Sequence, residues 1–408
     1  MNQIFRRAAV RSRILGNPIG SVLRQYVEHL VARGHRRDAL HQYVFAAEHF
    51  GRWLGRKSIT HVAVGRFIAS HLPDCRCEKP AVRCVNTVRA ALNRLLEMRG
   101  VSRPDPIVPP AVRRILRGYE DHLHGVCGLA GSTIRYRLRD AREVLDQFEV
   151  GRVSQMRSWV PSKIADYVAT AGRRCKPSSG QVLASSIRSF LRFLLLHGLI
   201  RRDLAAAVPS FANWRLAALP AVVDRSELEK LLSATDATTF IGMRDRGVLL
   251  CMTDLGLRAS DVAAITTDGF DATTGILRIK HPKDRRVAEL PMTKRLTKGL
   301  EHYLRRGRPR CPAPQLFVSH RAPVGRPLKP MGILGVVLRC AARAGLGESI
   351  RGTHVIRHSV ASSLINAGAS IKQIADLLGH RTIDTTAIYA KVDLRSLKRV
   401  AMPWPVGP

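Results

Sequence analysis

Two side chains that could do chemistry stand close together near the end of the chain, in LLGHRTIDTTAIYA. His380 follows a glycine, and Tyr389 comes nine residues later. The preceding residues, GASIKQIADLLGH, have the capping box and apolar spacing of a short helix that ends at Gly379. His380 is therefore expected just past a helix end, and Tyr389 in the second turn of the next helix. A tyrosine so placed is either a packing residue of a helix-turn-helix DNA reader or a nucleophile, and this stretch fits both.

Further basic side chains occur upstream at spacings that let them converge. His354 and Arg357 are three residues apart in GTHVIRHSVASSLINAG, so they share one face of the predicted helix. Arg258, in TDLGLRASDVAAI, follows a glycine turn and opens a new helix with Asp261 one turn on. The ordinary alternatives are a solvated basic face for the first pair and a structural salt bridge with Asp261 for Arg258.

One more cation comes from GILRIKHPKDRRVAELPM, which predicts two short strands around a polar turn. The turn offers Lys280 and Lys283. The spacing counted back from Leu290 and Pro291 favours Lys283.

Taken together, these side chains resemble the catalytic set of the tyrosine recombinases, the phage-integrase family. The six are Arg258, Lys283, His354, Arg357, His380 and Tyr389. The matching motifs are GLRASD, HVIR, and LLGH followed by the tyrosine, over roughly 220–395. Asp261 stands where a glutamate is common in that family, and the carboxylate is retained. The resemblance implies an enzyme that breaks and rejoins DNA, with no cofactor and no metal.

The implied chemistry suits these residue types. Arg258 and Arg357 would neutralise a phosphodiester and its five-coordinate transition state. Tyr389 would attack phosphorus and form a 3′-phosphotyrosine. A free tyrosine has a pKa of about 10, so the attack needs a base or a strongly positive site, and the resemblance assigns the role of proton acceptor to His354.

The other two residues complete the implied set. His380 would hydrogen-bond a phosphate oxygen, and Lys283 would protonate the leaving 5′ oxygen. Because recombination requires two strand exchanges at two sites, the resemblance also implies a tetramer of this chain on double-stranded DNA. An accessory recombinase or a DNA-bending protein is a further partner to expect.

The charge of the chain points to nucleic acid independently of the motifs. Lys and Arg number 67 against 31 Asp and Glu, which gives +36 over 408 residues. A field this positive attracts polyanions. The basic start lacks the apolar run of a signal peptide, and no apolar stretch approaches membrane-spanning length. We therefore expect a bacterial cytoplasmic protein, nucleoid-associated when bound to DNA, with no membrane partner and with its eight cysteines reduced.

The elements that must position the six residues fall into blocks separated by proline-rich linkers. We expect a helical N-terminal region at 1–104, a helical core-binding domain at 111–208, a catalytic domain at 220–396 and a tail at 397–408. The expected fold is mainly α with a small β-sheet in the catalytic domain. By resemblance, the core-binding block is SAM-like, the catalytic domain is α+β, and the two close around DNA. A predicted buried stripe in the core-binding block comprises Val182, Ile187, Phe190, Leu191 and Leu194.

Other functions stay open on the sequence alone: a type IB topoisomerase, a non-catalytic DNA-binding regulator, and a zinc-dependent architectural protein. The last would rest on Cys75, Cys77 and Cys84, with His71 nearby. Cys-x-Cys lacks the two-residue gap of a zinc knuckle and no second pair follows at ribbon spacing, so free thiols are favoured. The DNA target and the role in integration, transposition or resolution stay open too, although the long region before residue 111 favours a mobile-element enzyme.

Overall fold

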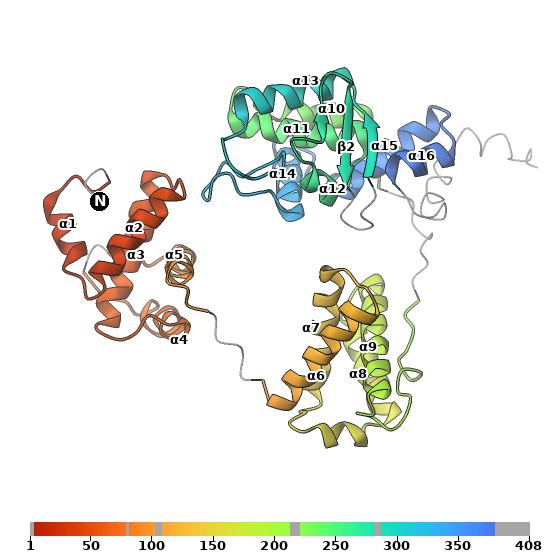
Figure 1. Cartoon of the computed structure of the whole chain (residues 1–408), viewed down its shortest axis with the longest axis horizontal. Helices are drawn as coiled ribbons and strands as arrows, with labels where there is room; N and C mark the ends of the chain where they lie inside the picture. Colours follow the sequence, from red (N-terminus) through yellow and green to blue (C-terminus); the bar gives the residue numbers. More distant parts are fainter. Residues whose placement is uncertain (1–3, 79–80, 103–107, 213–220, 281–286, 380–408) are drawn as a thin grey trace, which may run out of the picture. The chain divides into compact units, whose positions relative to one another are not determined.

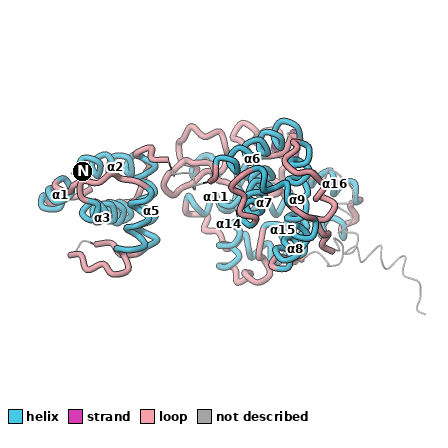
Figure 2. The backbone as a smooth tube through the Cα atoms, turned by 90° about the horizontal axis from the view of Figure 1, so that it is seen from below, coloured by secondary structure: helices cyan, strands magenta, loops and turns pink. Residues whose placement is uncertain are grey.

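The protein is described from a computed structural model. It covers residues 4–78, 81–102, 108–212, 221–280 and 287–379. Helices make up most of this part of the chain (Figures 1 and 2). The sheet has three short strands. The predicted fold class, mainly α with a small sheet, is confirmed. None of the helices in these ranges is both long and apolar enough to cross a membrane.

Apolar side chains collect into three main cores, within residues 4–96, 112–208 and 223–356. In the first core α3 and α5 pack together, and α2 packs on α3. The Tyr26 hydroxyl donates a hydrogen bond to the Ala91 carbonyl oxygen at 2.7 Å, which ties α2 to α5. The elements are α1 (Ala8–Leu15), α2 (Gly20–Ala32), α3 (Arg37–Leu54), α4 (His61–Arg66), the π-helical turn η1 (Phe67–His71) and α5 (Val85–Met98).

Residues 104–218 form a compact unit of helices. In it α7 and α8 pack against α9, and α6 packs against α7. The helices are α6 (Pro110–Asp121), η2 (His122–Val126), α7 (Gly131–Gln147), η3 (Val153–Ser158), α8 (Pro161–Arg173) and α9 (Pro177–Leu196). Three of them, α6, α8 and α9, begin with a proline, whose fixed φ suits the first helical position.

The buried stripe predicted for α9 is right at four positions and wrong at one. Ile187, Phe190, Leu191 and Leu194 are buried, whereas Val182 is exposed. Leu183 takes the inward place instead. Successive helical residues differ by about 100° in direction, so one position separates the two faces.

Helix α11 lies at the centre of the C-terminal core. It packs against α10, α12, α13, α14 and α15, and apolar residues on all its sides are buried. The helices of this part are α10 (Arg225–Ser233), α11 (Phe240–Leu255), α12 (Ala259–Ala264), α13 (Lys294–His302), η4 (Tyr303–Gly307), α14 (Pro330–Arg343), α15 (Thr353–Asn366) and α16 (Ile371–Leu378).

The sheet is antiparallel in the order β1-β2-β3. Its strands are β1 (Phe270–Asp271), β2 (Ile276–Lys280) and β3 (Val287–Pro291). The hairpin of β2 and β3 was predicted, and the register pairs Lys280 with Val287 at the end where the chain passes from one strand to the other. Strand β1 was not predicted, because two residues are too few to show alternation.

Candidate active site

Helix α15 carries His354 and Arg357 near its N-terminal end. Arg357 is only 4% exposed. Its Nη1 donates a hydrogen bond to the carbonyl oxygen of Gly256 at 2.8 Å, and its Nη2 donates to that of Leu378 at 2.6 Å. Both carbonyls lie at the C-terminal end of a helix, α11 or α16, where the helix supplies no N–H partner. A buried cation is stabilised there by the helix dipoles as well as by the two hydrogen bonds.

These contacts place Arg357 beside the other predicted motifs. Gly256 precedes Arg258 by two residues, and Leu378 precedes His380 by two. Gly256 has a left-handed backbone conformation with φ 61°, and a Cβ at this position would lie 2.7 Å from Leu378 Cδ2. A larger residue would therefore be strained by the backbone and would have to displace the Leu378 side chain. One buried side chain therefore holds three segments that are far apart in the sequence.

Arg258 caps the N-terminus of α12, as predicted, and its side chain is 35% exposed. Its Nη1 lies 3.8 Å from Oδ2 of Asp261, whose side chain is buried in the first turn of the helix. The salt bridge considered from the sequence is therefore present. At this distance it is an ion pair without a hydrogen bond, so Asp261 orients the guanidinium of Arg258 while leaving it more accessible than that of Arg357.

His354 is exposed on the surface of α15. Partial desolvation of its ring lowers its pKa below the ordinary 6.5, and the cations of Arg357 and Arg258 lower it further. The imidazole is therefore neutral at neutral pH and able to accept a proton. Arg357 follows His354 by one turn of α15, and its hydrogen bond to Gly256 places it beside the turn that leads to Arg258, so the structure brings these three predicted residues into one site.

A second histidine of α15 was not singled out from the sequence. His358 lies one turn after His354, with the two ring centroids 6.4 Å apart. Burial lowers the pKa of His358, and His354 and Arg357 lower it further. The available signal was the i, i+4 spacing in HVIRH, which puts both rings on one face.

Helix α16 begins and ends as predicted. Ser370 and Gln373 form a capping box, and Gly379 ends the helix in a left-handed conformation with φ 61°. Of the six predicted site residues, Lys283, His380 and Tyr389 lie outside the described residues. Lys280, the alternative to Lys283, is the exposed last residue of β2.

Several known proteins are similar in sequence to this chain over most of their length. A family model described as the phage integrase family matches residues 221–395. A putative integrase/recombinase, y4rA of Sinorhizobium fredii, is 33% identical over 95% of this chain and 95% of its own. The tyrosine recombinase XerD of Xanthomonas axonopodis pv. citri is 31% identical over 71% of this chain and 97% of its own.

Solved structures share the fold. XerH, a site-specific recombinase bound to its difH substrate after cleavage, has a TM-score of 0.56 at 17% identity over 82% of this chain and 93% of its own. A lambda integrase tetramer bound to a Holliday junction has a TM-score of 0.54 at 15% identity over 81% of this chain and 92% of its own. These similarities place the chain in the class of enzymes that break and rejoin DNA strands. Within this class, the chain belongs to the phage integrase family, the tyrosine recombinases, as its motifs predicted.

Proposed function

We propose that this chain is a site-specific recombinase that cleaves and reseals double-stranded DNA through a 3′-phosphotyrosyl intermediate, with Tyr389 as the nucleophile. The observation that carries the proposal is the cluster of Arg258, His354 and Arg357. It is assembled across 101 residues of sequence by the bond from Arg357 to Gly256. A protein that only read DNA would not require two arginines to converge on a neutral histidine.

The charges of this cluster suit an attack on a phosphodiester. Arg258, the more exposed arginine, contacts the non-bridging oxygens, and Arg357 adds positive charge from a fixed position. The Tyr389 oxygen attacks phosphorus while its proton passes to the neutral His354. The bond from phosphorus to the 5′ oxygen breaks, and the new phosphotyrosine keeps a high-energy ester for resealing by a 5′ hydroxyl.

Two further roles follow from the order of the motifs. Lys283, in the connection between β2 and β3, protonates the leaving 5′ oxygen. His380, two residues after the carbonyl that Arg357 binds, donates a hydrogen bond to a phosphate oxygen. The reverse transfers reseal the strand.

The proposed partners are double-stranded DNA and three further copies of this chain. The net charge of +36 supports DNA binding dominated by phosphate contacts. The lambda integrase relative forms a tetramer on a Holliday junction, which supports a tetrameric synapse here. In this assembly residues 111–208 form the core-binding domain and 220–396 the catalytic domain, whereas the tail at 397–408 lies outside the described residues.

Integration or transposition of a mobile element is the proposed biological role. The putative integrase y4rA matches over 95% of this chain, whereas XerD matches over 71%. The extra length supports a specialised enzyme with its own N-terminal region. A structure of the Tn1549 transposon integrase, with a TM-score of 0.53 at 16% identity, shows that a transposon enzyme shares the fold.

Covalent capture on DNA tests the proposal. Full-length wild type and Tyr389→Phe would be incubated with nicked duplexes taken from the DNA that flanks the gene, then denatured. We expect a protein–DNA band with the wild type and none with Tyr389→Phe, while both bind DNA. Tyr136→Phe, at an exposed tyrosine of α7, is the matched control and keeps the band.

Two other outcomes would change the conclusion. Tight DNA binding by both proteins, with no adduct at any nick position, would make the chain a non-catalytic regulator. Relaxation of supercoiled DNA without any preferred site would make it a topoisomerase of type IB.

A further inference from the structure

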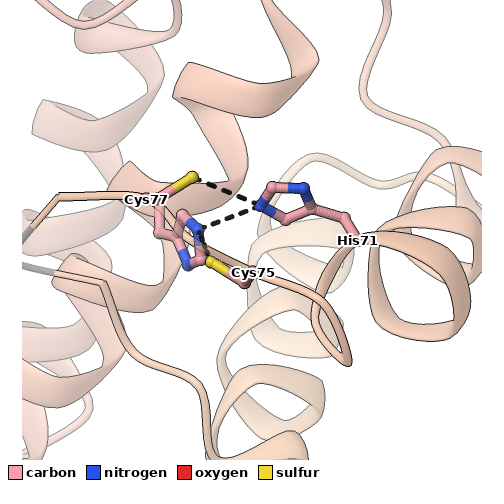
Figure 3. A group of neighbouring side chains, drawn as sticks. His71, Cys75 and Cys77 are labelled. Carbon is pink, nitrogen blue, oxygen red and sulfur yellow. Dashed lines mark hydrogen bonds between the residues drawn. The ribbon is translucent and has the colours of Figure 1, made fainter.

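Four side chains of the N-terminal region converge on one point, and none of them belongs to the proposed active site. They are His49, His71, Cys75 and Cys77, and their nitrogen and sulfur atoms all lie within 4.8 Å of one another. His49 is a fully buried residue of α3, His71 ends η1, and the cysteines lie on the loop that follows. Figure 3 shows His71 and Cys77 turned toward each other, with Cys75 beside them.

The spacing of these atoms is that of a metal ligand shell. His71 Nε2 lies 3.2 Å from His49 Nε2 and 3.5 Å from Cys77 Sγ, and Cys75 Sγ lies 3.4 Å from His49 Nε2. Tetrahedral zinc bonds nitrogen at about 2.0–2.1 Å and sulfur at about 2.3 Å. This geometry separates neighbouring ligand atoms by about 3.3 Å for two nitrogens and about 3.6 Å for nitrogen and sulfur. The three short distances in the cluster are close to these values.

The backbone holds the ring of His49 in the form that binds a metal. Its Nδ1 lies 3.2 Å from the carbonyl oxygen of Val82. A carbonyl can only accept, so Nδ1 carries the hydrogen and Nε2 presents its lone pair to the cluster. Metal-binding histidines commonly donate their other N–H to a carbonyl in this way.

Hydrogen bonds alone account poorly for the arrangement. The two imidazole nitrogens that face each other can share only one hydrogen, and a thiol is a weak donor and a weak acceptor. A divalent cation engages all four lone pairs at once, and two thiolates would balance its charge. Arg83, whose Nη2 lies 3.4 Å from the carbonyl oxygen of Cys77, adds a cation that favours thiolates.

Sequence spacing does not reveal this set of four ligands. In the sequence Cys75 and Cys77 stand near Cys84, and the spacing of these three cysteines favours free thiols. In the structure Cys84 is exposed just before α5 and stands outside the cluster. The fourth ligand atom comes from His49 instead, 22 residues before His71.

We propose that His49, His71, Cys75 and Cys77 form a structural Zn²⁺ site that fastens the segment 72–84 to α3. Four protein ligands leave no open position for substrate, so the site is structural. Among the described residues of this segment only Leu72 and Cys75 are buried. The segment therefore has little apolar area of its own, and a metal supplies the energy that fixes it.

Metal content of the full chain tests the site directly. Wild type, Cys77→Ser, His71→Gln and the matched control Cys84→Ser would be purified without chelator and measured by inductively coupled plasma mass spectrometry. We expect about one zinc per chain in wild type and in Cys84→Ser, and a loss of more than about half in the other two. Wild type without zinc after growth with added zinc would overturn the proposal, as would full zinc in Cys77→Ser.

A measurement on the folded wild type guards against variants that fail to fold. Thiols would be alkylated with and without a zinc chelator, and the labelled cysteines identified by mass spectrometry. We expect the chelator to increase labelling of Cys75 and Cys77 by at least about tenfold and to leave Cys84 unchanged. Equal labelling in both conditions would count against the site. The outcome is independent of recombinase activity, so its failure would leave the proposed function untouched.

Discussion

Arg357 donates a hydrogen bond to the carbonyl oxygen of Gly256 at 2.8 Å, and this bond joins the helix that carries His354 to the turn that carries Arg258. Gly256 is the C-cap residue of α11 and lies two residues before Arg258. A displacement of the buried arginine would therefore move the exposed one. The two cations form one structural unit, and they should respond together when either support is changed.

Replacement of Arg357 by lysine tests whether cleavage requires the planar guanidinium, with its two hydrogen bonds, and not only a positive charge. An ammonium cannot bind the carbonyls of Gly256 and Leu378 with the geometry of a planar guanidinium. We expect Arg357→Lys to cleave at least about 100-fold more slowly, with DNA affinity changed by less than about threefold. Arg351→Lys is the control, because Arg351 is exposed, lies just before α15 and pairs with the exposed Glu348. Cleavage near the wild-type rate by Arg357→Lys would show that charge alone is enough.

Two glycine substitutions separate backbone strain from the contact with α16. Gly256 and Gly345 both have positive φ, at 61° and 71°, so alanine costs about 1–2 kcal/mol at either position. Only at Gly256 would the new Cβ also overlap Leu378, whereas nothing lies within 4 Å at Gly345. Urea unfolding should show the larger loss of stability for Gly256→Ala. Only Gly256→Ala should lose cleavage as well, and equal behaviour of the two variants would contradict this account.

The dependence of cleavage on pH follows from the lowered pKa of His354. As a proton acceptor His354 must be neutral, so activity is present above its pKa and is lost as the pH falls through that value. Because desolvation, Arg357 and Arg258 hold this pKa below 6.5, kcat/KM should fall on the acid side with a midpoint below pH 6.5. A midpoint at or above pH 6.5 would assign the loss of activity to another group. Circular dichroism of the DNA-free protein over the same pH range is the control, because it shows whether the fold persists where cleavage is lost.

The choice between Lys283 and Lys280 can be made with a modified leaving group. A 5′-bridging sulfur leaves as a thiolate and needs no proton, so it makes a general acid unnecessary. We expect Lys283→Ala to cleave ordinary DNA at least about 100-fold more slowly and to recover to within about tenfold of wild type on the sulfur substrate. Lys280→Ala, at the exposed end of β2, should cleave both substrates normally. If Lys280→Ala instead were slow on ordinary DNA and recovered on the sulfur substrate, Lys280 would be the general acid.

Local signals predicted the parts of the site that depend on neighbouring residues. The capping box of Ser370, the helix start after Arg258 and the β2–β3 hairpin each need only a few residues, and each is present. The bond from Arg357 to Gly256 could not be predicted this way, because it depends on how α11, α15 and α16 pack. His49 was missed for the same reason, since it reaches its cluster from a different helix.

The prolines that begin α6, α8 and α9 also act on the unfolded chain. A proline at a compatible position restricts the conformations open to the denatured state, which stabilises the fold by about 0.4–1 kcal/mol per site. With three such positions, residues 104–218 lose less conformational entropy on folding than a chain without them would. Part of the stability of this unit therefore comes from a restricted denatured state rather than from contacts within the fold.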